Sequence, residues 1–91
     1  MLGNRLKQLR LSFGLNQIEF GEKLNVTKQS VSNWENDNIM PSIDMLIKIA
    51  TTFSVSTDYL LGLTDKRTLV VEGLSDNQIA YIQTLINDIK K

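Results

Sequence analysis

The stretch that most constrains the fold is residues 16–36, NQIEFGEKLNVTKQSVSNWEN, in which two short helical patterns follow one another across a sharp break. Asn16 and Glu19 form a capping-box pattern at the start of the first helix. Asn25 tolerates the left-handed backbone conformation that ends a helix and turns the chain. Thr27 is placed to cap the second helix. The sequence therefore predicts two helices joined by a turn of three or four residues.

The second of these helices, expected at about residues 28–36, has two unlike faces. Val31 and Trp34 are three residues apart and share the side that should point into the domain. Trp34 at this spacing is expected in the core, not as an exposed platform for base stacking. The opposite side carries polar residues: Lys28, Gln29, Ser32, Asn33 and Asn36.

The amides on this polar side suggest a chemistry. An Asn or Gln side chain offers one donor and one acceptor in a plane, which matches the N6 and N7 edge of adenine in the major groove. Lys28 near the helix start can reach a guanine or a phosphate, and Gln17 can offer a phosphate its own amide beside the exposed N–H groups of the preceding helix. As a lone pair of polar residues, Gln29 and Asn33 would be interpreted as ordinary solvated side chains. Their position after this turn and their spacing favour a face that contacts DNA bases.

The segment from Arg5 to Asp65 resembles the Cro/cI-type helix-turn-helix family of phage repressors and related bacterial regulators. The resemblance rests on the position of Gln17, the stretch VTKQSVSNWE, the single Pro41 and the motif VSTDYLLG. It implies a compact bundle of five helices whose third helix lies in the major groove. Two positions depart from the family pattern, Gly21 where Ala is most common and Asn25 where Gly is most common, and both substitutes are physically tolerable.

The resemblance also assigns roles to individual residues. By it, Arg10 and Glu35 fall at positions that often form an ion pair. Positions that contact DNA in the family are occupied by Gln17, Thr27, Lys28, Gln29 and Asn33. Ser32 and Asn36 join this candidate DNA-binding set because they share the polar face.

We therefore expect an all-α fold, a five-helix phage-repressor-like DNA-binding bundle with an additional C-terminal helix. The expected organisation is a helix-turn-helix domain at residues 1–63, a connector at 64–74 whose TLVV stretch is compatible with a short extended piece, and a C-terminal helix at 75–91. Ile18, Phe20 and Leu24 are expected as apolar anchors of the second helix. A fourth helix after Pro41 should bury the apolar face formed by Ile43, Leu46, Ile47, Ala50 and Phe53.

The C-terminal helix begins at a second capping-box pattern, Ser75 and Gln78. An apolar stripe with helical spacing follows, made of Ile79, Ile82, Leu85, Ile86 and Ile89. The helix either folds back on its own bundle or pairs with the same helix of a second chain. We favour pairing, since palindromic operators are bound by two-fold dimers that place their recognition helices about 34 Å apart.

Composition excludes several classes of protein. The 91 residues contain no cysteine and no histidine, so disulfides, thiolate ligands and the commonest general bases are missing. We expect no enzyme, no cofactor and no metal site. The chain starts at a Met without a leader pattern and has no apolar run near the roughly 20 residues of a membrane span, which predicts a cytoplasmic protein.

The sequence thus predicts a transcriptional regulator, a repressor, that binds double-stranded DNA at a palindromic operator as a homodimer. Ten basic residues balance ten acidic ones, so we expect a lone domain to bind DNA weakly. The alternative is a protein-interaction module on the same scaffold, such as an antitoxin or an adaptor that binds a partner protein.

Overall fold

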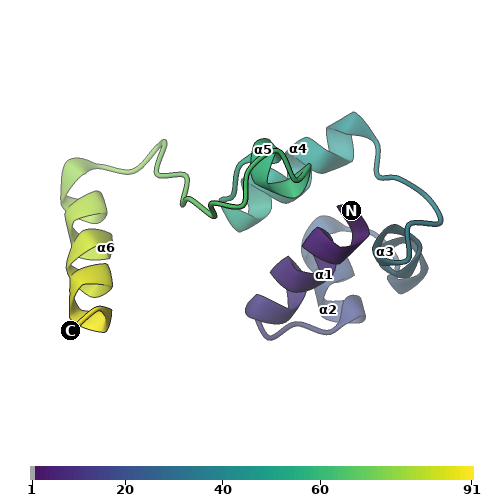
Figure 1. The fold of residues 1–91 in the computed structure, drawn as a ribbon, viewed down its shortest axis with the longest axis horizontal. Helices are drawn as coiled ribbons and strands as arrows, with labels where there is room; N and C mark the ends of the chain where they lie inside the picture. Colours follow the sequence, from purple (N-terminus) through teal and green to yellow (C-terminus); the bar gives the residue numbers. More distant parts are fainter. Residues whose placement is uncertain (1) are drawn as a thin grey trace.

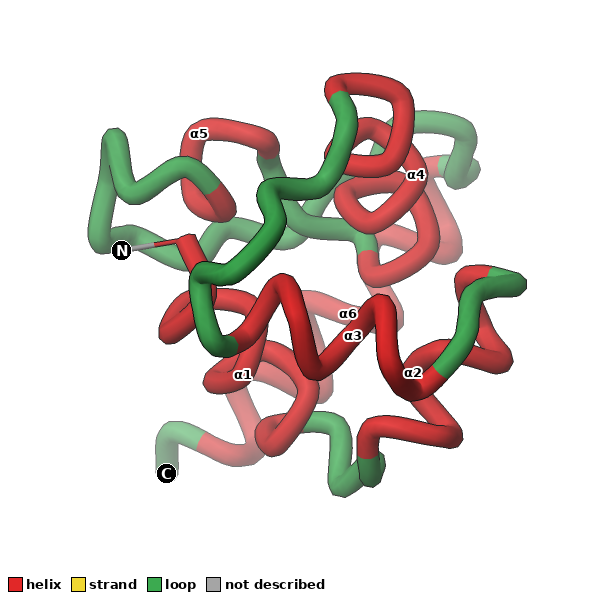
Figure 2. Tube along the Cα trace, turned by 90° about the vertical axis from the view of Figure 1, so that its right-hand side faces the viewer, coloured by secondary structure: helices red, strands yellow, loops and turns green. Residues whose placement is uncertain are grey.

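The computed structural model describes residues 2–91, and this part of the chain forms six helices and no strand (Figures 1 and 2). They are α1 (Leu2–Ser12), α2 (Gln17–Leu24), α3 (Lys28–Glu35), α4 (Ile43–Phe53), α5 (Thr57–Leu60) and α6 (Asp76–Ile89). Helices α1–α5 pack into one body, whereas α6 stands apart at one end of the long axis (Figure 1). The predicted five-helix bundle with an additional C-terminal helix is confirmed. No helix within residues 2–91 is long and apolar enough to cross a membrane.

The ends of α2 and α3 follow from local hydrogen bonds. Asn16 Oδ1 accepts the Glu19 amide at 2.7 Å, and Glu19 Oε1 accepts the Asn16 amide at 2.9 Å, which completes the capping box. Asn25 ends α2 with a left-handed φ of 58°. Thr27 Oγ1 then accepts the Ser30 amide at 3.1 Å and starts α3. These caps fix where the two helices begin and how sharply the chain turns between them.

The core of the body draws on every helix except α6. Its fully buried side chains are Leu6, Leu9, Phe20, Leu24, Val31, Ile49 and Leu60. Phe20 of α2 stacks on Phe53 of α4 with ring centroids 4.8 Å apart, and Phe13 meets the same ring edge-on at 5.1 Å. Each large apolar side chain buried in this way contributes about 1.5–3 kcal/mol relative to exposure. The core therefore holds α2 and α3 rigidly against α1 and α4.

Three predicted core residues are instead exposed. Ile18 is 53% exposed because the buried side of α2 runs through Phe20 and Leu24, and Ile18 lies off that side. In α4 the buried residues are Leu46, Ile49, Ala50 and Phe53, which repeat at one helical face. Ile43 and Ile47 lie outside this face and are 77% and 52% exposed. The prediction that they are buried was therefore wrong.

The first half of the predicted connector lies against the body. Arg5 Nη2 donates to Asp65 Oδ1 at 3.2 Å, and the Arg5 guanidinium lies 4.2 Å from the ring centroid of Tyr59. The guanidinium of Arg67 lies 5.6 Å from the ring centroid of Phe13 and 5.8 Å from that of Tyr59. Cation–π contacts of this kind contribute about 0.5–1 kcal/mol at exposed sites. They attach the segment to α1 and α5.

The second half leads away to α6. The Val70 amide donates to the Ser54 carbonyl at 3.1 Å, the last backbone hydrogen bond between this segment and the body. Residues 68–71 form no strand. The predicted capping box of Ser75 and Gln78 opens α6, with the Ser75 amide donating to Gln78 Oε1 at 2.9 Å. None of the residues of α6 is buried, so in this structure the helix does not fold back on its own bundle.

The close packing of α2 against the turn that follows it can be tested at Gly21. A Cβ added at Gly21 would lie 2.6 Å from the Val26 carbonyl oxygen, so the backbone would have to move. We expect Gly21→Ala to lower the free energy of unfolding, since overpacking costs roughly 1–3 kcal/mol and exceeds the gain in helix propensity of about 1 kcal/mol. Chemical denaturation measures this, with Glu22→Ala on the exposed side of α2 as the control. A Gly21→Ala protein at least as stable as the unaltered chain would contradict the close approach.

Candidate nucleic-acid interface

The two faces of α3 differ as the sequence predicts. Val31 and Trp34 are buried in the core, so Trp34 is not available as a stacking platform. On the outer side Thr27, Lys28, Gln29 and Asn36 are exposed, and Ser32 and Asn33 are half-buried. The structure therefore brings the predicted DNA-binding residues of α3 together on one open surface at the far end of the body from α6 (Figure 1).

The polar side chains on this surface are ordered by one another. Gln29 Nε2 donates to Asn33 Oδ1 at 3.2 Å, and Asn36 Nδ2 donates to Ser32 Oγ at 3.3 Å. Each pair is four residues apart and lies along one stripe of the helix. Gln29 keeps its carbonyl oxygen and one N–H, which is the donor and acceptor set that the adenine edge requires. Asn33 keeps both of its N–H groups.

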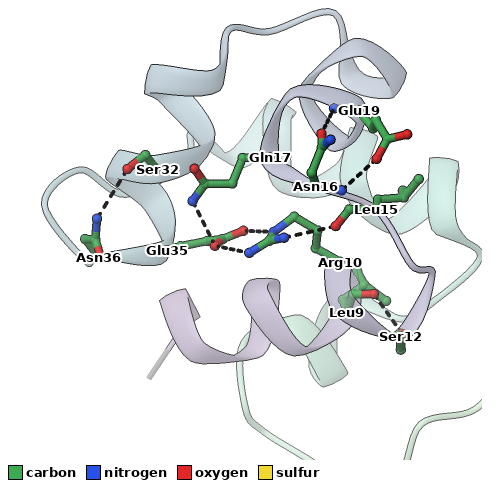
Figure 3. A network of polar contacts seen from close by, with 10 residues as sticks. All are labelled: Leu9, Arg10, Ser12, Leu15, Asn16, Gln17, Glu19, Ser32, Glu35 and Asn36. Atoms are coloured by element: carbon green, nitrogen blue, oxygen red, sulfur yellow. Dashed lines mark hydrogen bonds and ion pairs between the residues drawn. The ribbon is translucent and has the colours of Figure 1, made fainter.

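Gln17 is the one predicted contact outside α3 and its cap. It is the first residue of α2 and half-buried. Its Nε2 donates to Glu35 Oε1 at 3.2 Å, as Figure 3 shows. The side chain keeps its carbonyl oxygen and one N–H. It lies at the first turn of α2, where the Glu19 amide is capped by Asn16 and the preceding backbone N–H groups favour an anion such as a phosphate. Gln17 is thus held next to α3 by the same carboxylate that faces α1.

That carboxylate belongs to a buried ion pair. Arg10 Nε lies 2.7 Å from Glu35 Oε2, and Arg10 Nη2 lies 3.0 Å from Glu35 Oε1 (Figure 3). Arg10 Nη1 also donates to the Leu15 carbonyl at 2.9 Å. The hydrogen bond with Glu35 raises the pKa of Arg10 above its ordinary value although burial acts to lower it, so the cation persists throughout the physiological pH range. The bidentate pair connects α1 to the end of α3.

The contact between Gln17 and Glu35 was not predicted from the sequence. The two residues are 18 apart in the chain, and no helical spacing relates them. One signal was present: a carboxylate has about four acceptor positions, and a guanidinium in bidentate contact fills two. A buried Glu35 therefore calls for a further donor, and Gln17 supplies it.

The body of this chain is similar in sequence to known proteins. A family model described as helix-turn-helix matches residues 6–60. The HTH-type transcriptional regulator ImmR of Bacillus subtilis (strain 168) is 48% identical over 61 residues, which cover 67% of this chain and 48% of ImmR. This chain therefore spans about half the length of that relative.

Two solved structures extend the comparison. The P22 c2 repressor in complex with a synthetic operator is similar over 66% of this chain and 91% of that one, with a TM-score of 0.62 and 25% identity. A complex of the SinR and SinI proteins is similar over 99% of this chain and 98% of the matched chain, with a TM-score of 0.61 and 26% identity. The second match includes the region of α6.

The ion pair gives a prediction about stability. We expect Arg10→Met to lower the free energy of unfolding by about 3–5 kcal/mol, because it leaves the Glu35 carboxylate buried with only Gln17 as a partner. Glu35→Met should be similarly costly. The double variant should lose much less than the sum, since a buried pair replaced by apolar side chains leaves no uncompensated charge. Urea denaturation of all four proteins completes the cycle. Additive losses would show that the two side chains do not interact.

Proposed function

Because this chain belongs to the helix-turn-helix family, we propose that it is a sequence-specific regulator of transcription, a repressor, which binds double-stranded operator DNA with α3 in the major groove. In this proposal the protein binds DNA and does not catalyse a reaction, and it acts in the cytoplasm. It is supported by the P22 c2 repressor, a protein of similar fold whose structure contains operator DNA.

One observation carries this proposal. The exposed side of α3 presents Gln29 and Asn33 as a hydrogen-bonded pair, with free amide groups facing outward. An amide that is already oriented loses less conformational entropy when it meets a base edge, so more of the interaction energy appears as affinity. A good bidentate contact of this type discriminates against the wrong base by about 1–3 kcal/mol.

The remaining members of the site have supporting roles. Lys28 is exposed at the first position of α3, where it reaches a phosphate or a guanine. Thr27, Ser32 and Asn36 border the amides and contribute polar contacts to the DNA. Gln17 binds a phosphate with its free N–H, and its hydrogen bond to Glu35 fixes where that phosphate lies relative to α3.

Homodimerisation through α6 completes the proposal. The chain has a formal net charge of zero, so it lacks the general basic excess that strengthens phosphate binding. Two bodies joined through α6 would bind the two halves of a palindrome, which multiplies the contacts without a change in either body. The apolar residues of the helix, Ile79, Ile82, Leu85, Ile86 and Ile89, are its candidate contacts.

A second candidate function is the binding of a partner protein. It is favoured by the apolar stripe of α6, in which no residue is buried, and by the match of nearly the whole chain to a structure that contains the SinR and SinI proteins. In that case α6, and not α3, would be the main binding element. The polar face of α3 favours DNA as the first ligand.

Selection from a random duplex pool tests the proposal. At about physiological salt we expect the purified chain to enrich an inverted repeat whose half-site centres lie about one helical turn, or a multiple of it, apart. Against the enriched duplex, Gln29→Ala and Asn33→Ala should each reduce discrimination at particular base pairs by roughly 10-fold or more. Gln17→Ala should weaken binding to all sequences about equally.

Each of these variants needs a check on folding, since Gln17 also contacts Glu35. Glu22→Gln, an exposed change on α2, serves as the matched control and should leave both affinity and discrimination unchanged. If no sequence is enriched, DNA recognition is overturned and the partner-protein function takes its place. If the α3 variants lose stability but keep their sequence preference, the base-reading role of that face is wrong.

A further inference from the structure

Helix α6 presents an apolar face that is wider than a single partner helix requires. Its isoleucines step by three, four and three residues, so Ile79 and Ile86 occupy the a positions of a heptad and Ile82 and Ile89 the d positions. Leu85 then falls at g, beside this seam. It is 60% exposed, and Ile89 is 73% exposed. The face therefore spans three positions of the heptad.

The width of this face bears on the number of helices that meet. A two-stranded coiled coil buries only the a and d positions, and its g positions are commonly charged. Here the g positions are Gln78 and Leu85, and the e position between them is Gln83. An apolar a, d and g face is typical of a helix inside a bundle. Isoleucine at both a and d likewise disfavours the parallel two-stranded form.

The length of α6 leads to the same conclusion. It has 14 residues, close to the lower limit at which a helix is stable in water. Four seam side chains on each of two helices, at roughly 100 Å² apiece, would bury about 800 Å² in a pair. Stable interfaces between proteins bury about 1,200–2,000 Å². A pair of α6 helices therefore falls short, whereas additional helices supply the missing area.

The charges at the ends of α6 favour antiparallel copies of itself as neighbours. Asp76 lies in the first turn, and Lys90 and Lys91 follow the last. Lys91 Nζ lies 3.8 Å from Asp88 Oδ1, and Lys90 remains as the excess positive charge. Antiparallel neighbours place these acidic and basic ends side by side, whereas parallel neighbours place like charges together. A closed ring in which every neighbour is antiparallel contains an even number of helices. Two helices would leave the Leu85 side uncovered, and four cover it.

We propose that four copies of this chain assemble through an antiparallel four-helix bundle of α6, so that the assembly carries two pairs of DNA-binding bodies. This proposal rests on α6 as the assembly element of the proposed function and deepens it. The arrangement is compatible with the shape of the chain, since α3 lies toward the opposite end of the long axis from α6 and stays open (Figure 1). Only residues 71–75 link the bundle to the body beyond the Val70 hydrogen bond.

Sedimentation equilibrium of the full chain over a concentration series tests this assembly. We expect the unaltered protein to reach four times its chain mass of 10.3 kDa. Leu85→Lys narrows the apolar face of α6 to the a and d positions, which bury too little area for a stable pair, and should shift the mass from four chains toward single chains. Ile82→Lys disrupts the seam itself and should give single chains. Thr84→Lys adds the same charge at the f position, opposite the seam, and should leave the mass unchanged.

Trp34, the only tryptophan of the chain, lies buried in the body, and its fluorescence reports whether each variant keeps the body folded. Twice the chain mass for the unaltered protein would overturn the four-chain assembly and leave dimerisation intact. A single chain mass at all concentrations would overturn both. A Leu85→Lys protein that remains at four chains would refute the argument from the width of the face. The selection from a random duplex pool does not measure the mass of the assembly. It therefore tests DNA recognition separately from the number of chains that assemble.

Discussion

The buried ion pair between Arg10 and Glu35 is the constraint on which the arrangement of this body depends. Two charges removed from water are tolerable only when they are paired with good geometry, and here both guanidinium contacts are 3.0 Å or shorter. Glu35 follows Trp34 directly, so the pairing fixes the rotation of α3 about its axis. Trp34 must then face the core, and Gln29 and Asn33 must face outward. The ion pair and the buried Trp34 thus orient α3 in the same way, with its amides toward solvent.

How much of this follows from sequence depends on the range of the interaction. The caps at Asn16, Thr27 and Ser75 were predicted and are observed, because each involves hydrogen bonds that span only three residues. The turn at Asn25 was predicted for the same reason, since its φ of 58° is a property of one residue. The fold class followed from these local features together with the family resemblance.

Contacts between distant segments were harder to predict. Ile43 and Ile47 belong to an apolar pattern on α4, but which part of a broad apolar face is buried depends on where the neighbouring helices lie. The same holds for Arg67, whose position between the rings of Phe13 and Tyr59 attaches the connector to the body. The DNA contacts assigned to α3 and Gln17 remain predictions, since geometry alone establishes only that their side chains lie together and are accessible.

The zero net charge of the chain bears on the roles of both α3 and α6, which lie toward opposite ends of the molecule. A DNA-binding body without a basic excess gains little affinity from phosphates at physiological salt, and so depends on base contacts and on the number of bodies that bind together. The amides on α3, which are already ordered by their mutual hydrogen bond, are the groups proposed to make these base contacts. The binding of several bodies together requires an assembly element remote from the DNA. An exposed apolar helix at the far end is costly for a single chain in water, but its exposure is removed once several chains share it. Under the proposed function, α6 contributes to DNA affinity as much as the residues proposed to contact the bases.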